Sequence, residues 1–382
     1  MGLKTYTVEW TDLSVIVRVA SFCTVGGVSE LHASIELNPG FANAETQYCL
    51  LEEASQRLIK SFRDEGCNLV WKRFFVSDAI NQTSFLKTTE SEALSIVQQP
   101  PLNGSKASLL LYLVENAHLT SDTDNTVVMK RPFYEHLFHT QIHERTGDVT
   151  SQTRNIFDRY CNSLSRKGCS LGKNSIRTWI FVQNVDVQYV GMVVARKEYF
   201  EREGLTPQSH YIASTGIEGR YVHPEVLVLM DVYAIANIQA EQIRYLHAPS
   251  HLNPTYEYGV TFERGTAVDY GDRRHVFISG TASINNRGEI VHPLNVEKQT
   301  VRTFENVRAL LAEAGATMQH VVHIVVYLRD IADYAVVSRY VAQHYPDIPR
   351  VMLWAPVCRP GWLVEVECMA IVPAENQQFE KF

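Results

Sequence analysis

Two glutamates near the end of the chain carry the strongest chemical signal. The stretch WLVEVECMAI, residues 362–371, alternates apolar and polar residues, which predicts a β-strand with Glu365 and Glu367 on one face. Core-type residues flank both, so the pair either faces solvent or lies in a pocket where ionising both carboxyls is costly. In a pocket, burial and a like-charged neighbour would keep one carboxyl protonated near neutral pH, as a general acid requires.

The elements that position these glutamates recur three times. Helical periodicity leads to a glycine in TQYCLLEEASQRLIKSFRDEG, SQTRNIFDRYCNSLSRKG and KQTVRTFENVRALLAEAG. A strand follows each glycine, then a second helix and a final strand, expected in ASLLLYLVE, EVLVLMDVYAI and WLVEVECMAI. The pattern predicts an α+β protein of three repeated units, each a mixed sheet backed by two helices, at about residues 1–118, 119–240 and 241–382.

Composition and charge exclude several classes of function. The chain has 382 residues, 45% of them hydrophobic, and a formal net charge of −7, so we do not expect nucleic acid as a ligand. The seven cysteines form no CxxC pair, we assign no metal site to the fourteen histidines, and the phosphate-loop motifs are absent, so no metal or cofactor is expected. The sequence shows neither a membrane span nor a signal peptide, which predicts a cytoplasmic protein.

The third unit carries a family resemblance. The segments HVFISGTASINNRGEIV, VVHIVVYLRDIADYAVVSRYVAQHYP and PRVMLWAPVCRPGWLVEVECMAI resemble, in this order, the RidA/YjgF family. That family's fold is a sheet backed by two helices, and its members are trimers with a ligand site in each cleft between subunits. The resemblance implies that Arg350 binds a substrate carboxylate and that Glu365 positions a water. Two departures are Met352, where the family usually has Cys, and Phe262, where it has Tyr.

The second and third units together resemble a narrower family. The segments IRTWIFV, ASTGIEG, PTYEYG, FERGT, FISGTAS and CRPGWLVEVE, over roughly residues 130–371, are similar in order and type to the chorismatase family. Chorismatases remove the enolpyruvyl group of chorismate to give pyruvate and a cyclohexadiene diol acid or a hydroxybenzoate. The resemblance implies that Glu365 is the acid and that Arg177 is a carboxylate clamp.

A substrate with two carboxylates needs two cationic partners, and the planar fork of arginine suits a carboxylate better than lysine does. The candidate clamps are Arg177 and Arg350, followed by Arg329 and Arg359. The other residues that we assign to the same cleft are Tyr256, Tyr258, Gly280 and Cys358. Each has a structural alternative: Arg177 can form an ion pair in the core, the tyrosines can pack in a turn, and Cys358 can be an inert thiol.

Only the third repeat has the acid. The position of Glu365 matches about Leu229 in the second repeat and a leucine of SLLLYLVE in the first, whereas Glu367 matches Asp231. If the units form an internal pseudo-trimer, one of its three clefts is complete, and the chain is a monomer or a dimer. We therefore predict a chorismatase-like enzyme that acts on chorismate or a related small carboxylate. The alternatives are a RidA-type enamine or imine deaminase and a non-catalytic ligand-binding pseudo-trimer.

Overall fold

Three six-stranded sheets with the same strand plan form the protein, as the repeats predict. The computed structural model describes residues 2–38, 40, 43–86, 92–122 and 125–382. In each sheet one pair of neighbouring strands runs parallel, at the edge, and the other pairs are antiparallel. The chain is therefore an α+β protein built from three related units.

The first unit has one long helix. Its sheet has the order β1-β2-β3-β6-β4-β5. The strands are β1 (Gly2–Trp10), β2 (Val15–Cys23), β3 (Glu30–Leu37), β4 (Cys67–Val76), β5 (Ala93–Gln98) and β6 (Ala107–Glu115), and the helices are α1 (Ala44–Arg63) and α2 (Ala79–Gln82). Because α2 has only 4 residues, α1 is the one long helix behind this sheet within the described residues, where two were predicted.

The second unit has two long helices. Its sheet has the order β11-β10-β12-β9-β8-β7. The strands are β7 (His118–Asp122), β8 (Thr126–Lys130), β9 (Glu135–His143), β10 (Ser175–Val182), β11 (Ala213–Glu218) and β12 (Val228–Ala236). The helices are α3 (Val149–Arg166), α4 (Leu171–Asn174) and α5 (Val185–Arg202).

The third unit follows the same plan. Its sheet has the order β13-β14-β15-β18-β16-β17. The strands are β13 (Ile243–Leu246), β14 (Gly265–Asp269), β15 (Arg273–Ala282), β16 (Val321–Leu328), β17 (Arg350–Trp354) and β18 (Val364–Pro373), and the helices are α6 (Val296–Glu313) and α7 (Tyr334–His344). The segment that contains both glutamates is β18, which lies between β15 and β16.

The first long helix of each unit begins and ends in the same way. An Asn or Asp side chain accepts a hydrogen bond from a backbone N–H in the first turn of each, at Asn43, Asp148 and Asn295. After each helix comes a glycine with positive φ, Gly66, Gly168 or Gly315, which takes this conformation without a steric penalty. Among the described residues, no helix is both long and apolar enough to cross a membrane.

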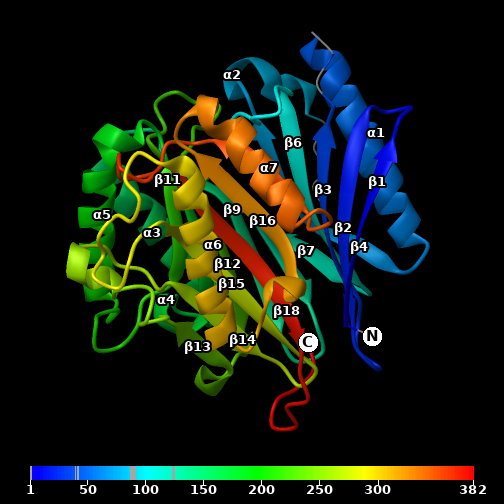
Figure 1. Cartoon of the computed structure of the whole chain (residues 1–382). Helices are drawn as coiled ribbons and strands as arrows, with labels where there is room; N and C mark the ends of the chain where they lie inside the picture. Colours follow the sequence, from blue (N-terminus) through cyan, green and yellow to red (C-terminus); the bar gives the residue numbers. More distant parts are fainter. Residues whose placement is uncertain (1, 39, 41–42, 87–91, 123–124) are drawn as a thin grey trace.

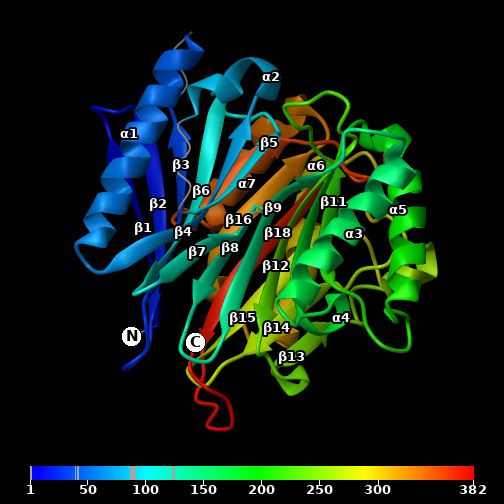
Figure 2. The same ribbon diagram turned by 180° about the vertical axis from the view of Figure 1, so that it is seen from behind.

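The three units close into a ring around a pseudo-threefold axis. The parallel edge strand of each unit lies against the third strand of the next, so that β5 contacts β9, β11 contacts β15, and β17 contacts β3. The long helices lie on the outside and the sheets face the centre (Figures 1 and 2). One chain thus forms a pseudo-trimer internally.

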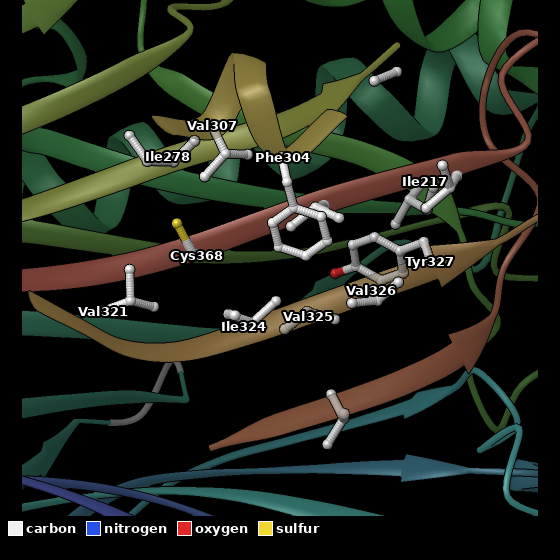
Figure 3. Close-up of a cluster of buried hydrophobic side chains, with 14 of the residues drawn as sticks. Ile217, Ile278, Phe304, Val307, Val321, Ile324, Val325, Val326, Tyr327 and Cys368 are labelled. Carbon is white, nitrogen blue, oxygen red and sulfur yellow. The ribbon is translucent and has the colours of Figure 1, made fainter. Parts of the chain in front are cut away.

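A hydrophobic core fixes the strands of the third unit (Figure 3). Phe304 and Val307 of α6 lie over the sheet, where Ile324 and Tyr327 of β16 and Cys368 of β18 belong to the same buried cluster. Burying each large apolar side chain contributes about 1.5–3 kcal/mol. This packing holds β18 in one register against β16, with Glu365 opposite Tyr327.

Candidate active site

Both glutamates of β18 are buried. Glu365 and Glu367 are each 3% exposed, so they do not form the solvated face of a strand. They also do not share one pocket, although the alternation of the sequence predicts a common face. Glu365 lines a pocket between the second and third units, whereas Glu367 lines a cavity at the centre of the ring. The two carboxyls therefore have different surroundings and different possible roles.

The Glu365 pocket is built from elements of two units. The second unit contributes α5 and β11, and the third contributes β15, the segment before β14 and the loop before β18. Gly280 of β15 lies directly against the acid, since an added Cβ there would be 2.1 Å from Glu365 Oε1 and 3.2 Å from Thr215 Cγ2. A side chain at this position would displace the carboxyl, so the glycine keeps the space that Glu365 occupies.

The environment of Glu365 favours a protonated carboxyl. Burial, followed by the charge of Glu367, raises the pKa of Glu365 to about 8. Glu367 instead accepts hydrogen bonds from Arg177 Nη2 and Trp179 Nε1, each at 2.8 Å, and from the Thr215 hydroxyl. Glu365 is thus available as an acid at neutral pH, and the negative charge of the ion-paired Glu367 helps to keep Glu365 protonated.

Three arginines surround this acid. Arg196, Arg264 and Arg359 line the pocket, and within the described part of the chain none has a carboxylate oxygen within 4.0 Å. Arg196 donates to Thr261 Oγ1 at 3.2 Å, but its buried Nη2 has no hydrogen-bond partner. Arg264 donates to the Asn253 carbonyl at 2.9 Å. Buried guanidinium groups without counter-ions favour an anionic ligand, and a carboxylate matches their geometry.

Sequence reasoning found only one of these three arginines. Arg359 was a candidate clamp, and Arg264 lies in the FERGT segment without an assigned role. The sequence pattern does not mark Arg196 as a site residue, because in ARKEYFER it is one charged residue among several on a helix. It is nevertheless only 1% exposed.

Arg350 lies at the contact between the third and first units, away from Glu365. Its backbone N–H donates to Ser34 Oγ at 3.0 Å, and its Nη1 donates to the carbonyls of Tyr345 at 2.6 Å and Pro346 at 3.0 Å. Burial, with a contribution from nearby Arg18, lowers its pKa to about 10. The structure therefore does not bring together the arginine and glutamate that the RidA resemblance pairs.

Ser214 of β11 occupies the position in the Glu365 pocket that corresponds to Arg350. Its backbone N–H donates to Ser279 Oγ at 2.9 Å, in the same way that Arg350 donates to Ser34 Oγ. The strand pairings give the same correspondence, because Ser214 lies beside Thr178 of β10 as Arg350 lies beside Ile324 of β16. In this pocket, Arg196, Arg264 and Arg359 supply the positive charge instead.

Two of the other proposed clamps, Arg177 and Arg329, also lie outside the pocket. Arg177 is buried and pairs with Glu367 at 2.8 Å in the wall of the central cavity. Arg329 pairs with Asp186 at 2.6 Å and donates to the Val357 carbonyl at 2.7 Å. Arg177 thus acts on Glu365 from outside the pocket, through its charge and through its partner Glu367. Arg329 fastens the third unit to α5 of the second.

The remaining predicted residues divide between two spaces. Tyr258, Gly280 and Cys358 line the Glu365 pocket. Tyr256 is 47% exposed and lines an outer hollow, which shares Arg264 with the inner pocket. Burial and the nearby Glu365 raise the pKa of the Cys358 thiol to about 12, which makes it a neutral wall residue rather than a nucleophile.

Comparisons with known proteins agree with this architecture. The family model described as endoribonuclease L-PSP matches residues 266–372. A RutC family protein of Pyrococcus abyssi is 33% identical over 98 residues, which are 25% of this chain and 76% of that protein. The 3-aminoacrylate deaminase RutC of Acinetobacter baylyi is 26% identical over 99 residues, 25% of this chain and 79% of the relative.

One solved structure resembles most of the molecule. The crystal structure of a chorismatase matches with a TM-score of 0.63 at 17% identity, and the match covers 79% of this chain and 92% of that one. This likeness shows a shared fold. The family follows instead from the 33% identity to the RutC family protein over three quarters of its length: the chain belongs to the RidA/YjgF family, whose model is described as endoribonuclease L-PSP.

Proposed function

We propose that the protein is a chorismatase-like enzyme that removes the enolpyruvyl group from chorismate or a closely related small carboxylate and releases pyruvate. The observation that carries the proposal is the composition of the Glu365 pocket. A buried carboxyl with a pKa of about 8 lies among three arginines that lack carboxylate partners. This is the combination that protonation of an anionic enol ether requires.

The reaction follows from these groups. Protonated Glu365 donates its proton to the terminal CH₂ carbon of the enol ether, and the oxygen lone pair stabilises the cation that forms at the adjacent carbon. The glutamate, now a carboxylate, faces that cation and accepts a proton from the water that attacks it. The resulting hemiketal loses its hydroxyl proton to the ring oxygen as the bond to that oxygen breaks, which gives pyruvate and the ring alcohol. One water is consumed, and Glu365 ends protonated as it began.

The arginines fit the charge of the substrate. Chorismate has two carboxylates, one on the ring and one on the enolpyruvyl group, and Arg196, Arg264 and Arg359 offer more than one cationic contact. Fixing both carboxylates would hold the CH₂ carbon against Glu365, and positioning of this kind lowers the barrier by removing orientational freedom.

A RidA-type enamine or imine deaminase is the second candidate. It is favoured by the likeness to 3-aminoacrylate deaminase RutC. Such a reaction needs one cationic carboxylate partner and one glutamate that orients water, and both are available in the pocket. The additional arginines argue for the larger, doubly charged substrate.

Parallel incubation with chorismate and with 2-iminopropionate tests the proposal. Pyruvate is followed by its reduction with lactate dehydrogenase, and the loss of chorismate is followed by chromatography. We expect enzyme-dependent pyruvate release from chorismate, which Glu365→Gln should slow about 10²–10⁴-fold. Accelerated hydrolysis of 2-iminopropionate with chorismate left intact would support the deaminase instead, and inactivity on both would contradict the chorismatase-like function.

A further inference from the structure

A second cavity lies on the pseudo-threefold axis, apart from the Glu365 pocket. All three units contribute to its wall, which contains six aromatic side chains, Trp71, Tyr112, Phe138, Trp179, Tyr233 and Phe277. The two carboxylates in the wall are both neutralised, because Asp231 pairs with Arg73 at 2.7 Å and Glu367 pairs with Arg177 at 2.8 Å. The space is thus mostly aromatic, with no net charge from these residues.

At one position of the cavity wall the third unit has a smaller side chain than the other two units. Arg73 of β4 and Trp179 of β10 hold corresponding positions, and the same position in β16 is Val325, as the pairings with the final strand of each unit show. Arg73 and Trp179 point large side chains at carboxylates of the next unit. Valine is much smaller, so the third unit leaves open the volume that a guanidinium or an indole fills in the other two.

Three histidines of the cavity wall have a buried ring nitrogen without a hydrogen-bond partner, namely His32 Nε2, His139 Nδ1 and His275 Nδ1. His32 of β3 is 4% exposed and stacks on Tyr112, with 4.6 Å between ring centroids. Its Nδ1 lies 3.3 Å from His323 Nδ1, whereas its buried Nε2 has no hydrogen-bond partner. Burial lowers the pKa of His323 to about 3 and that of His32 well below its usual value, so both rings are neutral.

His32 is also an exception in the repeat. The corresponding residues of the other units are Phe138 and Phe277, since each lies opposite the equivalent residue of the final strand of its sheet. A buried polar atom without a partner is costly, and phenylalanine would avoid that cost. Both departures from the repeat, Val325 and His32, therefore face the same cavity, one providing space and the other a hydrogen-bonding group.

We propose that the central cavity is a binding site for a small, neutral aromatic molecule with one hydroxyl or N–H group. The aromatic wall provides stacking contacts, the volume above Val325 accommodates the ring, and His32 provides the hydrogen bond. The paired carboxylates leave no free charge to attract an ion. This site is separate from the anion-binding pocket of Glu365 and does not depend on the proposed reaction.

Calorimetric titration of the full chain with phenol tests the site. We expect one phenol per chain and weaker binding of benzoate, which has a similar size but a negative charge. In Val325→Trp, which adopts the residue of the corresponding position in β10, phenol affinity should fall at least tenfold. Arg264→Gln, in the Glu365 pocket, should leave phenol affinity unchanged.

His32→Phe tests the hydrogen bond separately and adopts the residue of both other units. It should weaken phenol binding about 2–10-fold, as expected for loss of one hydrogen bond, and should leave benzene binding unchanged. If Val325→Trp fails to fold, as circular dichroism would reveal, the comparison of phenol with benzene in His32→Phe tests the proposed site by itself. Four results would each overturn the proposal. Two are the absence of phenol binding by the wild-type chain at millimolar concentration and an unchanged phenol affinity in folded Val325→Trp. The other two are an equal weakening of phenol and benzene binding in His32→Phe and the loss of phenol binding in Arg264→Gln.

Discussion

Glu365 and Arg350 belong to the same unit but face different neighbours. Glu365 lines a pocket with Thr215 and Gly216 of the second unit, whereas the backbone of Arg350 donates to Ser34 of the first unit at 3.0 Å. In a closed ring every unit has two neighbours, so its functional residues are divided between two clefts. The cleft that has the acid therefore takes its positive charge from other residues.

The first prediction concerns the acid itself. Glu365→Gln keeps the shape and hydrogen bonding of the side chain but cannot deliver a proton, so kcat should fall about 10²–10⁴-fold with KM nearly unchanged. Steady-state kinetics with the substrate that the parallel incubation identifies would measure both. Full activity in this variant would show that the carboxyl has no role in the chemistry.

The second prediction concerns the pH profile. Because Glu365 acts in its protonated form and its pKa is about 8, kcat should fall as the pH rises above about 8. Glu367→Gln removes the negative neighbour, so the pKa of Glu365 should decrease and the alkaline limb should move to lower pH. Asp231→Asn is the matched control, because Asp231 corresponds to Glu367 and pairs with Arg73 between the first two units. An equal shift in both variants would contradict the specific effect of Glu367.

The third prediction concerns stability. The pKa of Glu365 is raised from 4.5 to about 8 by folding, so the folded state binds more protons than the unfolded state between these values. The free energy of unfolding should therefore decrease as the pH rises from about 4.5 to about 8. Glu365→Gln removes this term, so the variant should gain stability relative to the wild type at pH 9 compared with pH 5. Urea unfolding at the two pH values measures the difference in unfolding free energy between variant and wild type. The same difference at pH 5 and pH 9 would refute the prediction.

The fourth prediction separates the arginines. Arg264→Ala should raise KM about 10–100-fold, as expected for loss of a charged hydrogen bond, and Arg264→Lys should recover little of it because the planar fork is lost. Arg350→Ala should change KM much less, because Arg350 binds backbone carbonyls of Tyr345 and Pro346 outside the pocket. A larger rise in KM for Arg350→Ala than for Arg264→Ala would show that Arg350 binds the substrate.

The fifth prediction concerns assembly. The ring of three units is closed within one chain, so no further copies are needed to complete a cleft. We expect a monomer of 43.4 kDa, or a dimer, by light scattering at micromolar concentration. A stable trimer of chains would contradict this expectation.

The sequence could predict the elements of each unit because their signals are local. Helical periodicity, an Asn or Asp at the helix start and a glycine after its end all act within a few residues, and the first long helix of each unit begins and ends as those signals indicate. The alternation in β18 likewise gave the strand and its two glutamates. A register is less local: the residue that corresponds to Glu365 in the first unit is Ser108, not a leucine, since Ser108 lies opposite Phe75 of β4 as Glu365 lies opposite Tyr327 of β16.

The sequence by itself thus determined the repeat, the fold class and the one unit that holds an acid. Only the tertiary structure decided which arginines surround that acid. Arg196 comes from α5 of one unit, and Arg264 and Arg359 come from two loops of the next, so their convergence depends on how two units meet. The separation of Arg350 from Glu365 has the same origin. Spacing along a chain fixes the face of a strand or helix, but a cleft between units forms only when separate hydrophobic faces are buried against each other, and no local pattern records that geometry.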